Sequence, residues 1–135
     1  MPAESGAFSL LTYNVAGLPE GISSSHPYVN IPLISPRLNA FDIVLVQEDF
    51  FYPSALESQV KHMFRSEPNR EFPLGDGLNY FSVFPFKNMI RNAWDTCNGQ
   101  LDNGSDCLTP KGFSYAVFEI APGVEVDIYN LHMDA

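Results

Sequence analysis

The sequence predicts an α/β fold, on three observations. Residues 43–46 form a short apolar run rich in β-branched side chains, which is typical of a strand buried on both faces of a sheet. Two segments with helix-start signals, residues 34–41 and 54–64, lie on either side of that strand. Two further apolar runs, residues 113–121 and 124–132, are separated only by Pro-Gly and predict an antiparallel hairpin.

The composition indicates a globular chain with a negative charge. Of its 135 residues, 45% are apolar and 17% charged, enough for one domain that buries roughly two thirds of its unfolded surface. The net charge of -9 makes nucleic acid a less favoured partner, because such binding depends on Lys and Arg. A phosphate substrate stays compatible where a divalent cation supplies the positive charge. No apolar run approaches the ~20 residues of a transmembrane helix.

The chain contains two cysteines, Cys97 and Cys107, in a polar segment. They either pair in a disulfide or remain as free thiols, and we favour the disulfide. Since disulfides persist in oxidising compartments, this favours a secreted or extracellular protein, with a cytoplasmic location left open.

The N-terminal part predicts one strand and a long connection. Residues 8–15 are expected as the first strand, and residues 16–32 as an irregular loop broken by glycine and proline. His26 is expected on its surface. A short helix follows over residues 34–41, with Ser35 as its cap and proline at the first helical position.

The middle of the chain predicts a second helix over residues 54–64. Ser54 and Glu57 have the spacing of a capping box, and His62 is expected on the surface or at its boundary. The expected apolar stripe consists of Leu56, Val60, Met63 and Phe64. Residues 78–84 predict a strand, whereas the polar segment 87–112 is assigned no helix or strand.

Three of the predicted strands end in polar side chains. Asn14 comes near the end of the first strand, Glu48 directly follows the buried strand, and His132 ends the last one. If these strands are neighbours, an amide, a carboxylate and an imidazole converge on one site. Carboxylate and amide oxygens suit Mg²⁺ or Mn²⁺, and an imidazole can contact or protonate a phosphoester oxygen. The alternative is that Asn14 and His132 only satisfy loop backbone.

Three motifs in this order resemble those of the endonuclease/exonuclease/phosphatase superfamily: LLTYNVAGLP, DIVLVQEDF and VDIYNLHMDA. The superfamily includes deoxyribonucleases, inositol polyphosphate 5-phosphatases and sphingomyelinases. The resemblance implies a four-layer α/β sandwich with mainly antiparallel sheets and a divalent-cation-dependent phosphoester hydrolase. It also implies that Glu48 is a metal ligand, that Asn14 serves the phosphate or the metal, and that His132 contacts the scissile phosphate.

Two further residues take roles from the same resemblance. Asp134 is expected to orient local structure. The segment CLTPKGF resembles a Lys-Gly element of sphingomyelinase-like members, which makes Lys111 a substrate contact. A solvated loop lysine is the alternative. Together with the acidic charge and the expected disulfide, this element favours a sphingomyelinase-like phosphodiesterase acting on a phospholipid headgroup.

The resemblance covers only the front of such a domain. Family members carry an Asp-x-Asn pair and a final Asp-His pair after the histidine strand, and neither occurs after His132 here. Residues 1–135 are therefore expected to be the N-terminal half of one domain, with little or no activity alone and an exposed sheet edge that favours self-association. The alternatives are a nuclease, an inositol-phosphate phosphatase, or a non-catalytic interaction module that keeps half the site.

Overall fold

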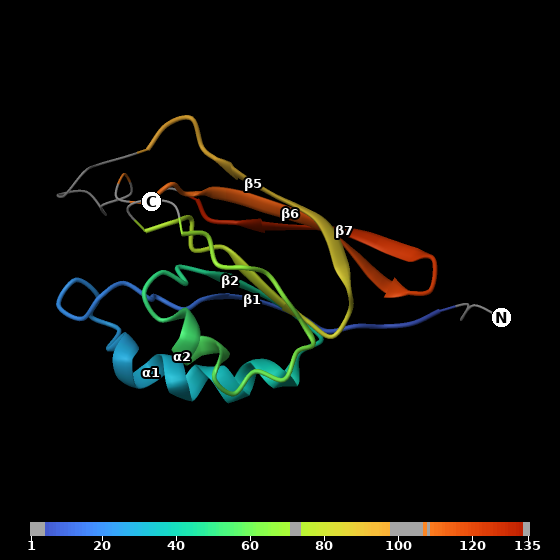
Figure 1. Cartoon of the computed structure of the whole chain (residues 1–135), viewed down its shortest axis with the longest axis horizontal. Coiled ribbons are helices and arrows are strands. Elements are labelled where there is room, and N and C mark those ends of the chain that lie inside the picture. Colours follow the sequence, from blue (N-terminus) through green and yellow to red (C-terminus); the bar gives the residue numbers. More distant parts are fainter. Residues whose placement is uncertain (1–4, 71–73, 98–106, 108, 134–135) are drawn as a thin grey trace.

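The structure is a computed structural model, and it describes residues 5–70, 74–97, 107 and 109–133. Two β-sheets face each other, and the helices cover the outer face of the first sheet (Figure 1). In spatial order the first sheet contains β1 (Leu10–Asn14), β2 (Ile43–Gln47), β4 (Asn79–Ser82) and β3 (Phe64–Arg65). The second contains β5 (Phe86–Ala93), β6 (Gly112–Ala121) and β7 (Val124–Leu131).

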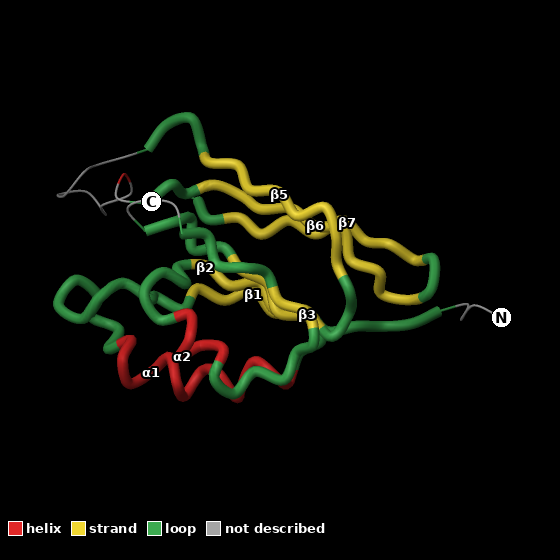
Figure 2. Tube along the Cα trace, in the orientation of Figure 1, coloured by secondary structure: helices red, strands yellow, loops and turns green. Residues whose placement is uncertain are grey.

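The predicted α/β class with mainly antiparallel sheets is confirmed. Among the strand pairs of the described residues, β1 and β2 run parallel and the others antiparallel. The helical segments are α1 (Pro27–Ile34), the 3-10 turn η1 (Ser35–Ala40) and α2 (Pro53–Glu57). Figure 2 shows these helices on one side of the first sheet and the second sheet on its other side.

Strand β2 is buried along its whole length, as predicted. Val44 and Val46 point into a core shared with the helices, whereas Ile43 and Leu45 point into the core between the two sheets. Alternate residues of a strand face opposite sides of its sheet, so a strand between two cores must be apolar on both faces. This explains the unbroken apolar run in the sequence.

The predicted C-terminal hairpin is also confirmed. Strands β6 and β7 pair antiparallel, with Phe113 opposite Leu131, and Gly123 takes a positive φ of 74° in the turn. Ala116, Phe118 and Ile128 face the core between the sheets. The hairpin therefore anchors β7, and with it the segment that leads to His132.

The predicted helix boundaries in the first third of the chain are wrong. Helix α1 begins inside the segment expected to be an irregular loop and runs on to Ile34, and most of the helix predicted over residues 34–41 is the 3-10 turn η1. Ile31 is fully buried, so packing rather than local signals stabilises α1. Ser35 is buried and is not the predicted N-cap: it is the C-cap residue of α1, and its hydroxyl accepts a hydrogen bond from the Gln59 backbone at 3.0 Å.

The predicted helix over residues 54–64 is also too long. Helix α2 ends at Glu57, and its N-terminus has no side-chain cap. Asn39 competes with helical bonding beyond that point, since its amide donates to the Gln59 carbonyl at 2.9 Å and accepts from the Lys61 backbone at 2.7 Å. Met63 is consequently 81% exposed instead of lying in an apolar stripe.

His62 is buried, which contradicts the prediction of a surface or boundary residue. Its Nε2 lies 2.8 Å from the carbonyl oxygen of Phe41, and its ring packs beside Phe81. This histidine therefore belongs to the structural core. His26, in contrast, is exposed as predicted, at the N-terminus of α1.

Strand β5 is not predicted by the sequence, because all of it except Phe86 lies in the polar segment 87–112. Its side chains are mostly exposed or half-buried, so its sequence lacks the apolar pattern of a core strand. The predicted disulfide between Cys97 and Cys107 is present. Within the described residues, no helix has the length and apolar character needed to span a membrane.

Candidate active site

The structure brings together the three polar residues that end β1, β2 and β7. Asn14 Nδ2 donates a hydrogen bond to Glu48 Oε1 at 2.8 Å, and His132 Nε2 lies 3.4 Å from the same oxygen. Asn14 and Glu48 come from adjacent parallel strands, in which Asn14 pairs with Gln47. His132 comes from the second sheet. The site therefore joins both sheets at one carboxylate oxygen.

Glu48 has an unusual backbone conformation, with a φ of 60° in the left-handed region. Its carbonyl accepts hydrogen bonds from Gly17 N at 2.9 Å and from Phe50 N at 3.0 Å. A Cβ at Gly17 would lie 2.5 Å from that carbonyl oxygen, and a Cβ at Gly77 would lie 2.5 Å from the Phe50 ring. Only glycine fits at these two positions. Gly17 and Gly77 therefore belong to the site, although the sequence pattern did not identify them.

Polar neighbours keep Glu48 ionised. The His132 imidazole holds the pKa of the Glu48 carboxyl below its usual value, and the Asn14 hydrogen bond and the Lys111 charge act in the same direction. Partial burial opposes them. A carboxylate that is ionised at neutral pH and partly shielded from solvent is suited to bind a cation.

Asn14 is oriented by a second hydrogen bond. Its Oδ1 accepts from the Ala16 backbone at 2.8 Å, so its Nδ2 faces Glu48. In this arrangement Asn14 acts as a donor that fixes the Glu48 carboxylate. The side chain itself is exposed on the edge strand β1.

A pocket of about 160 Å³ opens at Glu48 and His132. Lys111 lines the same pocket and is half-buried rather than fully solvated. The remaining wall consists of Thr109 and of the apolar side chains of Leu18, Pro19, Ile22, Phe50, Phe51 and Leu74. The pocket therefore combines one charged side with an apolar side.

The neighbouring carboxylate, Asp49, is turned into the protein and does not join this pocket. Its Oδ2 accepts a hydrogen bond from Asn79 at 2.8 Å, and its Oδ1 is buried without a partner among the described residues. Burial raises the pKa of Asp49 to about 6.

Of the two adjacent carboxylates, Glu48 is therefore the one that faces the pocket. Among the described residues, no group of three or more His, Cys, Asp and Glu side chains gathers as a metal site. Magnesium usually binds through one or two carboxylates and keeps several waters, so a single Glu48 fits part of such a ligand set. Asp134 lies outside the described residues.

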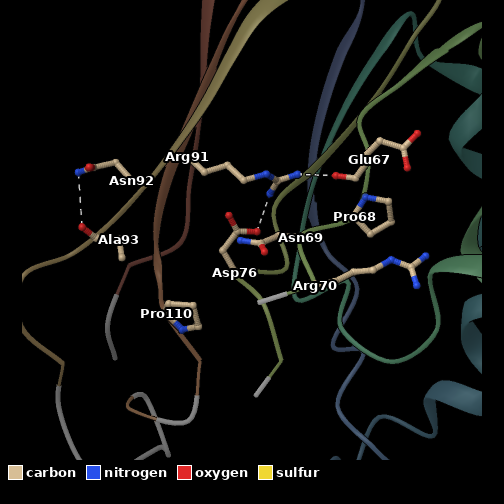
Figure 3. A pocket seen from close by; sticks show the side chains of 9 residues that line it. All are labelled: Glu67, Pro68, Asn69, Arg70, Asp76, Arg91, Asn92, Ala93 and Pro110. Carbon is tan, nitrogen blue, oxygen red and sulfur yellow. Dashed lines mark hydrogen bonds and ion pairs between the residues drawn. The ribbon is translucent and has the colours of Figure 1, made fainter. Parts of the chain in front are cut away.

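A larger cavity of about 360 Å³ lies beside Asp76 and Arg91 (Figure 3). The Arg91 guanidinium donates to Asp76 Oδ1 at 2.6 Å, to the Glu67 carbonyl at 2.8 Å and to Asn79 Oδ1 at 3.1 Å. These contacts link β5 to the loop before β4. The guanidinium is thus already engaged by protein acceptors.

Sequence comparisons point to sphingomyelinases. No family model matches the chain. The sphingomyelinases of Mycobacterium tuberculosis (strain H37Rv) and Mycobacterium bovis are each 39% identical to it over 137 residues. Each alignment covers 95% of this chain and 27% of the relative, so the chain spans about a quarter of the length of these relatives.

Solved structures agree on the fold. Beta toxin from Staphylococcus aureus has a TM-score of 0.77 at 21% identity, covering 96% of this chain and 51% of the toxin. Sphingomyelinase C from Streptomyces griseocarneus has a TM-score of 0.72 at 18% identity, covering 97% and 50%. A further beta toxin structure, a mutant with bound magnesium ions, has a TM-score of 0.76 at 20% identity, covering 95% and 50%.

Over nearly its whole length the chain is similar in sequence to sphingomyelinases, and its fold is that of beta toxin and sphingomyelinase C.

Proposed function

We propose that this chain forms part of a divalent-cation-dependent phosphodiesterase of the sphingomyelinase type. The proposal is supported mainly by one observation: Asn14 and His132 both contact the Glu48 carboxylate, and Glu48 and His132 line a single pocket. It is also supported by the 39% identity to mycobacterial sphingomyelinases.

Glu48 would hold Mg²⁺ or Mn²⁺. When bound, such an ion stabilises the negative charge that develops on a phosphoryl oxygen. Asn14 keeps the Glu48 carboxylate in place through its Nδ2 hydrogen bond. His132 faces the same carboxylate oxygen, from where its imidazole can donate a hydrogen bond to a phosphoryl oxygen.

The pocket supports a lipid phosphodiester as the substrate class. Lys111 supplies a positive charge near Glu48 for the phosphate, and the apolar wall that includes Ile22 and Phe51 offers a surface for the lipid part. The net charge of -9 argues against a polyanion such as DNA.

The setting of the enzyme follows from the same features. The disulfide between Cys97 and Cys107 favours an oxidising compartment and hence a secreted protein. The Asp-x-Asn and Asp-His motifs of the superfamily do not follow His132 in this sequence, so we expect residues 1–135 alone to have little or no activity. Self-association through the sheet edges at β1 and β7 is a further expectation, which sedimentation velocity tests.

The test compares Mg²⁺-dependent hydrolysis of sphingomyelin, DNA and an inositol polyphosphate by the native-length protein. We expect sphingomyelin to be cleaved, and the Glu48→Gln variant to lose at least about a hundredfold in kcat/KM. Glu57→Gln is the matched control, because Glu57 is a half-buried carboxylate of α2 paired with Arg65. Preferred cleavage of DNA would instead indicate a nuclease, and preferred cleavage of the inositol polyphosphate would indicate an inositol-phosphate phosphatase.

Calorimetric titration with Mg²⁺ separates an enzyme from a non-catalytic module. We expect saturable binding by the parent protein, and at least about tenfold weaker binding by Glu48→Ala. Equal binding by the two proteins would contradict the assignment of Glu48 as a ligand.

A further inference from the structure

A pair of amide side chains joins the two sheets next to the candidate site. Gln47 Nε2 donates to Asn130 Oδ1 at 2.6 Å, and Asn130 Nδ2 donates to the Val46 carbonyl at 2.9 Å. Gln47 is 7% exposed and Asn130 only 1%. Gln47 directly precedes Glu48, and Asn130 comes two residues before His132.

The same pair also reaches the third strand of the site. Gln47 Nε2 also donates a hydrogen bond to Thr12 Oγ1 at 3.0 Å, and Thr12 comes two residues before Asn14. Residues two apart in a strand share one face. One layer of hydrogen bonds therefore ties β1, β2 and β7 together directly beside the layer of Asn14, Glu48 and His132.

This arrangement is unusual for its surroundings. The core between the sheets consists largely of apolar and aromatic side chains, among them Leu45, Phe118 and Ile128. Burying amides there costs free energy that their hydrogen bonds roughly offset, and an apolar pair of similar size would be about as stable. The amide pair therefore adds orientation rather than stability.

We propose that Gln47 and Asn130 are positioning residues, which set the separation of Glu48 and His132 by holding the ends of β2 and β7 together. The proposal rests on the proposed function for its kinetic readout, although not for its structural one. Neither residue lines the pocket, so neither acts on substrate or metal itself.

The same core contains a matched control. Tyr80 Oη and Ser114 Oγ lie 2.8 Å apart and also join the two sheets, but they belong to β4 and β6, which do not lead to Glu48 or His132. Tyr80→Phe deletes this buried inter-sheet hydrogen bond and leaves the hydrogen bonds among the side chains of Gln47, Asn130 and Thr12 in place.

The test uses the double variant Gln47→Met/Asn130→Leu in the native-length protein, in which both partners become apolar. We expect its thermal midpoint to stay within about 3 °C of the parent, while kcat on sphingomyelin falls by about tenfold to a hundredfold with KM nearly unchanged. Tyr80→Phe should do the reverse, with a lower midpoint and the parent kcat. Should the double variant not fold, Asn130→Asp keeps the acceptor for Gln47 and removes the donor to Val46, and a similar loss of kcat is expected.

A crystal structure of the variant provides the independent readout. We expect the distance between Glu48 Oε1 and His132 Nε2 to exceed the 3.4 Å of the parent chain. A variant with the parent kcat and an unchanged separation overturns the proposal. If the parent protein hydrolyses no phosphodiester, the proposed function fails, whereas the measured separation still decides whether the amide pair positions the two residues.

Discussion

Glu48 Oε1 and His132 Nε2 lie 3.4 Å apart, although Glu48 follows β2 of the first sheet and His132 follows β7 of the second. No local segment produces this contact. It exists because β2 and β7 face each other across a shared core, so that any change in sheet packing reaches the candidate site.

The backbone turn at Glu48 should tolerate no side chain at Gly77. Gly77 has a φ of 66°, and an added Cβ would lie 2.5 Å from the Phe50 ring and 3.0 Å from Glu48 Cα. We expect Gly77→Ala to lower the free energy of unfolding by more than about 2 kcal/mol and to weaken Mg²⁺ binding. Gly123→Ala is the control, because it has a φ of 74° but open space, and it should cost about 1 kcal/mol without changing Mg²⁺ binding. Equal effects of the two variants would contradict the steric account.

Asp49 should make stability depend on pH. Burial raises its pKa to about 6 from 3.8, so the folded state holds the proton more tightly than the unfolded chain. The stabilisation that protonated Asp49 provides is fully present below about pH 4 and is lost as the pH rises through about 6. The free energy of unfolding falls by up to about 3 kcal/mol over this range.

Asp49→Asn should remove this dependence. The asparagine still accepts the hydrogen bond from Asn79, and it carries no charge to bury. Urea unfolding of both proteins between pH 4 and 7 measures the effect. The same decline with pH in the parent and in Asp49→Asn would show that another group is responsible.

Arg91 should be a major contributor to stability. Its partner Asp76 has a side chain only 7% exposed, so removing the guanidinium leaves a buried carboxylate without its cation. We expect Arg91→Met to lower the free energy of unfolding by about 3 kcal/mol, measured by urea denaturation. The exposed pair of Lys87 and Glu125 is the comparison, and Lys87→Met should leave the unfolding midpoint unchanged. If Arg91→Met changed the free energy of unfolding as little as Lys87→Met does, the structural role of Arg91 would be contradicted.

The two cysteines should resist alkylation until they are reduced. Because Cys97 and Cys107 are paired, iodoacetamide should leave the intact mass of the unfolded, unreduced protein unchanged and add two groups after reduction. Alkylation before reduction would show free thiols instead.

Several elements followed from local sequence alone. The apolar run of β2 was recognisable because a strand between two cores needs apolar residues on both faces. The hairpin of β6 and β7 was recognisable because its apolar runs flank a Pro-Gly turn. The candidate site was recognisable because the three strands could be identified from their apolar patterns, and polar residues stand at their ends.

Other elements depended on distant contacts. Asn39 and Ser35 bind the backbone after α2 and keep the chain from continuing as a helix, although its sequence contains a capping-box pattern. Strand β5 is half exposed and forms because β6 offers a partner, so its own pattern was uninformative. The burial of His62 likewise comes from its contact with Phe41.

By itself, the sequence determined which chemical groups stand at the strand ends: an amide at Asn14, a carboxylate at Glu48 and an imidazole at His132. Tertiary structure decided that Asn14 and His132 both contact Oε1 of Glu48, and that the neighbouring Asp49 side chain turns inward. The physical reason is that strand identity is a local property of side-chain pattern. The meeting of strand ends instead depends on how two sheets pack and on buried hydrogen bonds, such as that of Gln47 with Asn130, between residues far apart in the chain.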